Sequence, residues 1–260
     1  AFFIIGLVLL YYLIFKDRIQ ANRLFRKGIT AIEAGKYPLS EKYFEQAEEI
    51  LGGRKDKSWY FKYSNEYIDR GEFLYSERKL IGEIRKEDIG GGRYDIKPIK
   101  KTGTGLVFAY PEDTEVRLNI AKLYESWGKF DILLDDHSST PQLQYSDSLM
   151  YLRNKNPKDV KILNKIGMAY IKWAQSPNVS RLASENYYRI AKEKYFDEVL
   201  KLNKKNVDAI SGVVSIAVNT NQGVDAIYLD LKKAELFNSI SNRALTDLGN
   251  YYLNQDKPEI

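Results

Sequence analysis

The chain has 260 residues, of which 44% are hydrophobic and 29% charged, and this composition excludes a wholly disordered protein. The 40 basic residues are interleaved with 35 acidic ones, so the net charge of +5 indicates a solvated surface and disfavours a nucleic-acid-binding face. The absence of Cys excludes disulfides, thiolate metal sites and a cysteine nucleophile.

An uncharged apolar run opens the chain and ends at Lys16. As a helix the run would be about 22 Å long, shorter than a hydrocarbon core of about 30 Å, so we expect further apolar residues upstream. No small-residue cleavage site follows it, which favours a retained transmembrane anchor over residues 1–16 and disfavours a cleaved signal peptide. The anchor residues are Phe2, Phe3, Ile4, Ile5, Leu7, Val8, Leu9, Leu10, Tyr11, Tyr12, Leu13, Ile14 and Phe15.

Basic residues cluster directly after this run, at Lys16, Arg18, Arg23, Arg26 and Lys27. By the positive-inside rule they place the following chain in the cytoplasm, whereas basic residues upstream would reverse that orientation. The orientation therefore stays open at the level of sequence. The same cluster is suited to contact anionic lipid headgroups.

Helix-turn-helix patterning begins after the basic cluster. Small residues recur where two helices would touch, and aromatic residues recur beside them, which is the arrangement that lets helices pack closely. In the first unit these residues are Gly28, Ala31, Gly35, Tyr37, Ser40, Phe44 and Ala47. This framework resembles a tetratricopeptide repeat. The resemblance implies an all-α solenoid of helix-turn-helix repeats, preceded here by the transmembrane helix.

Further units of the same kind follow along the chain. Gly71 lies 36 residues after Gly35, close to the family period of about 34. We expect repeats 1 and 2 over residues 18–87 and repeats 3 to 6 over residues 115–260. The third repeat has an extended turn at residues 135–141 and a second helix that ends at Asn156. The fifth repeat matches the pattern less well. The sixth contains only its first helix. We therefore expect the full protein to continue beyond residue 260.

Residues 88–114 interrupt the helical period and form an inserted loop. The stretch from Leu106 to Tyr110 has strand-like composition, which allows a small hairpin or an extended segment docked on a partner. Its glycines do not match a GxxxxGK[ST] loop or a GxGxxG motif after a strand. A flexible or partner-ordered loop is therefore favoured over a phosphate site.

No motif for catalysis is present: the sequence lacks GxSxG and HExxH. The single His, His137, follows Asp135 and Asp136 in a turn, and a solvated turn is favoured over a metal or acid–base site because no second His or Cys is available as a ligand. We predict no catalytic, metal or cofactor-binding residues and no enzyme activity.

The resemblance also implies a concave groove lined by positions five, nine and twelve of each first helix. Carried onto this chain, these are Phe25, Ile29 and Ile32; Phe61, Asn65 and Ile68; Leu118, Lys122 and Glu125; and Asn164, Met168 and Ile171. The first half is apolar and favours docking of a partner helix or an extended apolar segment, with coverage by a helix of the same chain as the alternative. A carboxylate clamp is disfavoured because position five lacks Lys.

These features predict a membrane-anchored scaffold that binds other proteins of a multi-subunit membrane complex and the lipid bilayer, with homo-oligomerisation open. We expect a single-pass protein of a bacterial inner membrane with a periplasmic repeat domain. Its richness in Lys, Ile, Asn and Tyr and its degenerate repeats are similar to those of spirochaete proteins of the collar around the periplasmic flagellar motor. The alternative is a chaperone-like or quality-control factor associated with the protein translocon.

Overall fold

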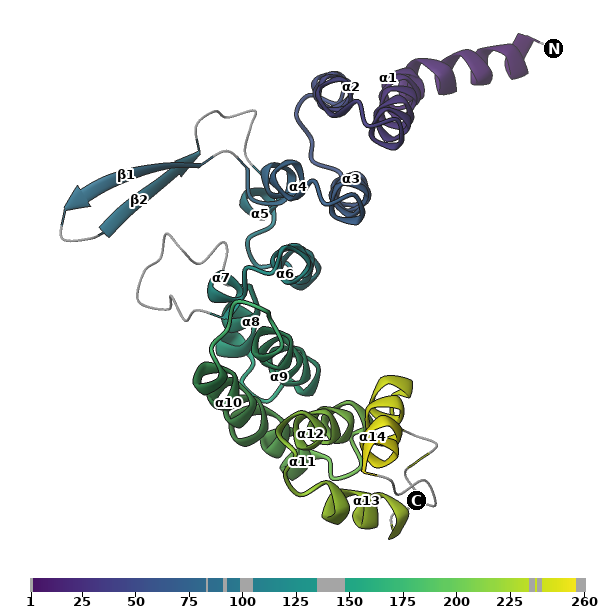
Figure 1. Cartoon of the computed structure of the whole chain (residues 1–260). Coiled ribbons are helices and arrows are strands. Elements are labelled where there is room, and N and C mark those ends of the chain that lie inside the picture. Colours follow the sequence, from purple (N-terminus) through teal and green to yellow (C-terminus); the bar gives the residue numbers. More distant parts are fainter. Residues whose placement is uncertain are drawn as a thin grey trace. The chain divides into compact units, whose positions relative to one another are not determined.

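The computed structural model describes residues 2–82, 84–90, 93–98, 105–134, 148–233, 237 and 240–255. Most of these residues are helical, so the predicted helical class is confirmed at this level, apart from one two-stranded hairpin (Figure 1). The chain divides into two compact units, Ala1–Trp127 and Gly128–Ile260. Their boundary falls inside the third predicted repeat.

The first unit contains six helices and the hairpin among its described residues. Asp56 caps the start of α3 by accepting hydrogen bonds from the amides of Ser58 and Trp59, and Gly35 and Gly71 end α1 and α3 in the left-handed region, with φ of 70° and 75°. The elements are α1 (Phe2–Glu33), α2 (Tyr37–Ile50), α3 (Lys57–Asp69), α4 (Phe73–Leu80), β1 (Ile84–Gly90), β2 (Arg93–Pro98), α5 (Leu106–Ala109) and α6 (Thr114–Trp127).

Helix α1 is continuous from Phe2 to Glu33, so the apolar run and the first helix of the first predicted repeat form one element. The helix has no break near residue 17, where the sequence placed the end of the anchor. A search of the described residues finds no helix that combines the length and the apolar character needed to cross a bilayer.

The core of the first unit is built from aromatic rings packed beside small residues. Phe44, Tyr63 and Tyr67 are fully buried, and the centroids of the Phe44 and Tyr63 rings are 3.9 Å apart. The hydroxyls of Ser64 and Ser76 lie 2.6 Å apart, which brings α3 and α4 into close contact. Small residues therefore lie at helix contacts, as the pattern predicts.

The inserted segment differs from the sequence prediction. Strands β1 and β2 pair antiparallel, with Ile84 opposite Pro98, and the first strand begins before residue 88. The prediction of a strand around residues 106–110 is wrong, because Leu106 begins the short helix α5. Leu106 and Val107 are fully buried, so contact with the helical core overrides their strand-like composition.

The residues that flank segment 83–104 are close to each other in the first unit. A Cβ added to Gly105 would overlap the backbone of Ile81 and Gly82, so the residues on either side of segment 83–104 lie against each other. A side chain larger than hydrogen does not fit at Gly105. The end of α4 and the start of α5 are thus close together, although 22 residues separate Gly82 from Gly105 in the sequence.

The second unit contains the remaining elements. Four of its helices begin at a capping residue, namely Asp159, Ser180, Asn206 or Ser241, whose side chain accepts hydrogen bonds from amides of the first turn. The elements are α7 (Phe130–Leu134), α8 (Ser148–Lys155), α9 (Val160–Ala174), α10 (Arg181–Ile190), the π-helical turn η1 (Ala191–Phe196), α11 (Asp197–Leu202), α12 (Val207–Thr220), α13 (Val224–Lys233) and α14 (Asn242–Asn254).

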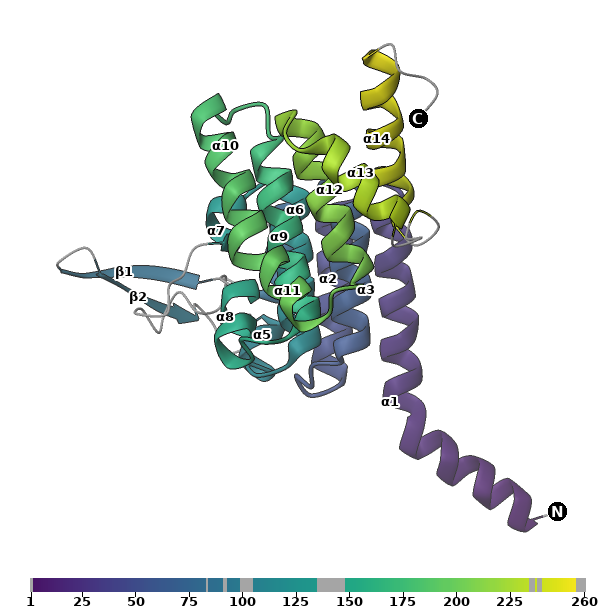
Figure 2. The ribbon, with the colours of Figure 1, turned by 90° about the horizontal axis from the view of Figure 1, so that it is seen from below.

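Phe196 is the central packing residue of the second unit. Its ring is fully buried, and a Cβ added to Gly167 on α9 would lie 2.7 Å from it, while one added to Gly212 on α12 would overlap it. Two glycines therefore make room for one aromatic ring between helices. A second cluster joins α12, α13 and α14, which lie together in Figure 2. The predicted turn at 135–141, including His137, lies outside the described residues.

Candidate functional site

All three predicted groove residues of the first helix are buried within the first unit. Phe25, Ile29 and Ile32 are 8%, 7% and 0% exposed. The Phe25 ring stacks on Trp59 of α3, with their centroids 4.7 Å apart, and lies 5.1 Å from the Tyr63 ring. These three side chains are covered by the chain's own helices and are not free for a partner.

The predicted residues on α3 and α6 are more accessible. Phe61, Asn65, Leu118 and Glu125 are half-buried and Lys122 is exposed, whereas Ile68 is 6% exposed and belongs to the core. The Lys122 ammonium donates a hydrogen bond to Asn65 Oδ1 at 2.6 Å. These accessible side chains form a mixed apolar and polar surface across two neighbouring helices of the unit.

In the second unit the predicted groove residues lie on α9. Asn164 and Ile171 are buried, and Met168 is half-buried. Asn164 Nδ2 donates to Asn206 Oδ1 at 3.0 Å, so the pair joins α9 to the start of α12. Asn164 therefore serves helix packing.

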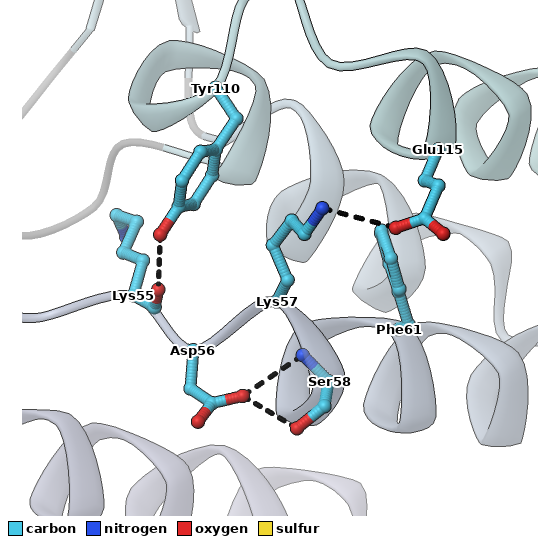
Figure 3. Close-up of a pocket in the computed structure, with 7 residues that line it drawn as sticks. All are labelled: Lys55, Asp56, Lys57, Ser58, Phe61, Tyr110 and Glu115. Carbon is cyan, nitrogen blue, oxygen red and sulfur yellow. Dashed lines mark hydrogen bonds and ion pairs between the residues drawn. The ribbon is translucent and has the colours of Figure 1, made fainter.

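A pocket of about 470 Å³ lies in the first unit, between the start of α3 and the segment that joins α5 to α6. Figure 3 shows side chains from both segments turned toward it. Its lining residues are Lys55, Asp56, Lys57, Ser58, Phe61, Tyr110 and Glu115. Among them only Phe61 had been predicted from the sequence as a groove residue.

An ion-pair cluster forms one wall of the pocket. The Lys57 ammonium lies 2.7 Å from Asp113 Oδ2 and 3.0 Å from Glu115 Oε2. Hydrogen bonds to these two carboxylates raise the pKa of Lys57. Partial burial pushes the pKa of Asp113 upward, but hydrogen bonds from Lys57 and from backbone amides outweigh it and hold that pKa below its ordinary value. Lys57 and Asp113 are therefore both charged at neutral pH.

The opposite wall joins Tyr110 to the start of α3. The Tyr110 hydroxyl donates to the Lys55 carbonyl oxygen at 3.0 Å. The Lys55 ammonium donates to the Tyr60 hydroxyl at 2.6 Å, and that hydroxyl donates to Glu48. Burial lowers the pKa of Lys55, and Glu48 partly opposes this effect.

The lining of this pocket favours binding of an apolar side chain over binding of a charged ligand. Each polar side chain of the lining already has a partner within the unit, while the rings of Phe61 and Tyr110 remain partly accessible. A charged ligand would have to displace existing ion pairs, whereas an apolar side chain would bury ring surface without breaking them. The sequence signal for this site was weak, since Lys57 and Asp113 are 56 positions apart.

Within the part of the chain that the structure describes, no group of three or more His, Cys, Asp and Glu side chains is placed to hold a metal ion. His137 lies outside that part.

No model of a known protein family matches the chain, and no curated protein or solved structure matches it. The likeness to tetratricopeptide repeats therefore rests on the residues of this chain alone. What the protein does has to be inferred from its helix packing and its surfaces.

Proposed function

We propose that the protein is a non-enzymatic, membrane-anchored scaffold whose helix pairs form a tetratricopeptide-like solenoid and bind other proteins of a bacterial envelope assembly. The observation that carries this proposal is the packing of successive helices through small residues at the predicted positions. Gly28 beside Tyr63 and Ser64 beside Ser76 are examples. Arrays of such pairs build extended surfaces for proteins.

The binding surface in this proposal combines the pocket with the accessible residues of α3 and α6. Phe61 belongs to both, and Lys122 extends the surface with a polar contact. A partner helix or extended segment would place an apolar side chain against Phe61 and Tyr110. The amphipathic character of the surface suits this mode of recognition.

The membrane part of the proposal rests on the apolar run at the start of α1. Insertion of this run would hold the helix pairs beside a bilayer, and the basic residues after it would contact anionic headgroups. The collar around a periplasmic flagellar motor is one assembly in which such a scaffold fits, on grounds of composition and architecture.

Cross-linking mass spectrometry on intact cells, combined with purification of the tagged full chain, tests the scaffold role. A scaffold should be recovered in a stable complex with a fixed set of envelope proteins. Cross-links to many newly synthesised secreted chains, without a stable complex, would contradict it and favour the quality-control factor at the translocon.

The Phe61→Ala variant tests the proposed surface. Loss of a central ring should weaken the complex by about 2 kcal/mol, because such anchors dominate binding energy. The matched control is Leu182→Ala, at a leucine that is 78% exposed and lies outside the pocket lining. Equal partner recovery by both variants, measured by quantitative pull-down at unchanged melting temperature, would rule out Phe61 as an anchor.

A further inference from the structure

A second pocket, of about 320 Å³, lies in the second unit between the end of α12 and the C-terminal half of α14. The two helices lie side by side in Figure 2, and they contact each other. The pocket is lined by Val218, Asn219, Asn221, Asp247, Asn250, Tyr251, Asn254 and Gln255. Neither the predicted groove nor the proposed scaffold surface includes any of these residues.

Side-chain amides dominate this lining. Five of the eight residues are Asn or Gln, and the lining contains one carboxylate, one phenol ring and no Lys or Arg. Asn250 and Asn254 are one helical turn apart, about 6 Å along α14, so they share a face of the helix. Their face meets the end of α12 across the pocket.

Much of the hydrogen-bonding capacity of these amides is unused. Across the described residues, the side chains of Asn250, Asn254 and Gln255 form no hydrogen bond, and all three are exposed. The side-chain nitrogen of Asn219 donates to the Ser215 carbonyl oxygen at 2.7 Å, and this bond does not use the side-chain oxygen of Asn219. Each free amide offers two donors and one acceptor oxygen.

This chemistry selects among ligand classes. An anionic ligand is disfavoured, because the lining carries Asp247 and no cation. An extended peptide is a poorer match, because its backbone presents each donor and each acceptor on a separate group, whereas every amide side chain of the lining offers both donors and an acceptor at one place. A ligand with several adjacent groups that both donate and accept is the better match.

We propose that this pocket binds a neutral saccharide. Hydroxyls of the saccharide would donate to and accept from the amides of Asn250 and Asn254. The half-buried Tyr251 ring would pack against the C–H face of the sugar. The site is independent of the scaffold surface, and binding requires no metal ion.

Saturation-transfer NMR on the full chain tests the proposal, in a detergent without a sugar headgroup. The probes are the N-acetylglucosamine trimer, maltotriose and a neutral Ala-Ser hexapeptide, each at up to about 10 mM, which covers complexes in the millimolar range. At least one trisaccharide should show saturable transfer. Asn250→Leu should lower its affinity about tenfold or more, the effect of losing a hydrogen-bonding group worth about 1.4 kcal/mol.

The matched control is Asn242→Leu, which makes the same change at the exposed start of the same helix, outside the lining. It should bind as the unchanged protein does. Transfer to the hexapeptide alone, binding of neither trisaccharide, or equal effects of the two variants would each overturn the proposal. Thermal melting of both variants separates loss of binding from loss of fold.

Discussion

Gly28 shows how one missing side chain controls the packing of the first unit. A Cβ at this position would overlap the Tyr63 hydroxyl, which lies against the backbone of α1. Gly249 on α14 is the opposite case, since no heavy atom lies within 4 Å of the position of its added Cβ. The two glycines look alike in sequence, and only their neighbours separate them.

We expect Gly28→Ala to lower the free energy of unfolding by about 1–3 kcal/mol through overpacking. Gly249→Ala, the control, should raise it by about 0.5–1 kcal/mol, because alanine restricts the unfolded chain and favours a helix. Urea denaturation followed by circular dichroism measures both. A similar change in the two variants would refute the packing role of Gly28.

Two buried tyrosines of the first unit differ in their hydroxyl partners. The Tyr63 hydroxyl has no hydrogen-bond partner among the described residues, whereas the Tyr67 hydroxyl lies 2.5 Å from Ser40 Oγ and donates to Glu41 at 2.7 Å. A buried hydroxyl without a partner destabilises the fold, and a satisfied one contributes to it.

The Tyr63→Phe variant should therefore be as stable as the unchanged protein or more stable by up to about 1 kcal/mol. Tyr67→Phe should lose about 1–3 kcal/mol, because Ser40 and Glu41 would each lose a partner. Chemical denaturation compares the two. If Tyr63→Phe lost as much as Tyr67→Phe, the assignment of hydroxyl partners would be wrong.

At the scale of elements, the insertion can be tested as a removable segment. Because Gly82 and Gly105 lie against each other, a short Gly-Ser linker can replace residues 83–104. Helical circular dichroism and melting temperature should be retained, while recovery of partners should fall if this segment contacts them. Unchanged recovery would exclude a binding role for the insertion.

The control deletion extends through Val107. It removes Leu106 and Val107, both fully buried, and should lower the free energy of unfolding by about 2–5 kcal/mol. Equal stability of the two deletions would show that α5 is not part of the core. Comparing the two deletions separates the effect of losing residues 83–104 from the effect of losing the start of α5.

The ends of two helices were predictable, because their signals are local. Gly35 and Gly71, which belong to the predicted repeat pattern, act on backbone groups within a few residues of themselves. The helix α5 could not be predicted in this way. Its residues favour a strand in isolation, and their burial against α4 and α6 reverses that preference.

At the scale of the whole molecule, the buried tyrosines make stability sensitive to alkaline pH. Burial raises the pKa of Tyr170 in the second unit to about 12, and it also raises the pKa values of Tyr60, Tyr67 and Tyr124 in the first. An unfolded tyrosine ionises near pH 10. The unfolded state therefore loses these protons first, so stability is full below pH 10 and falls as pH rises toward the folded pKa values.

We expect the melting temperature to stay nearly constant up to about pH 9 and to fall steeply above about pH 10. Lys57, whose pKa is raised by its carboxylate partners, acts in the same direction, whereas Lys55, whose pKa burial lowers, acts in the opposite one. Calorimetry together with tyrosinate absorbance measures the effect. Ionisation of all the tyrosines near pH 10 in the folded protein would contradict it.

The sequence by itself determined the predominantly helical class and some of the small residues that allow close packing, such as Gly28. Tertiary structure alone decided which apolar faces stay accessible: Phe25 and Ile32 are covered by α3 and its neighbours, while Phe61 borders a pocket. It also brought Lys57 to Asp113 across 56 positions. The physical reason is that periodicity encodes which side of a helix is apolar, whereas the identity of the neighbour that covers it depends on contacts between distant segments.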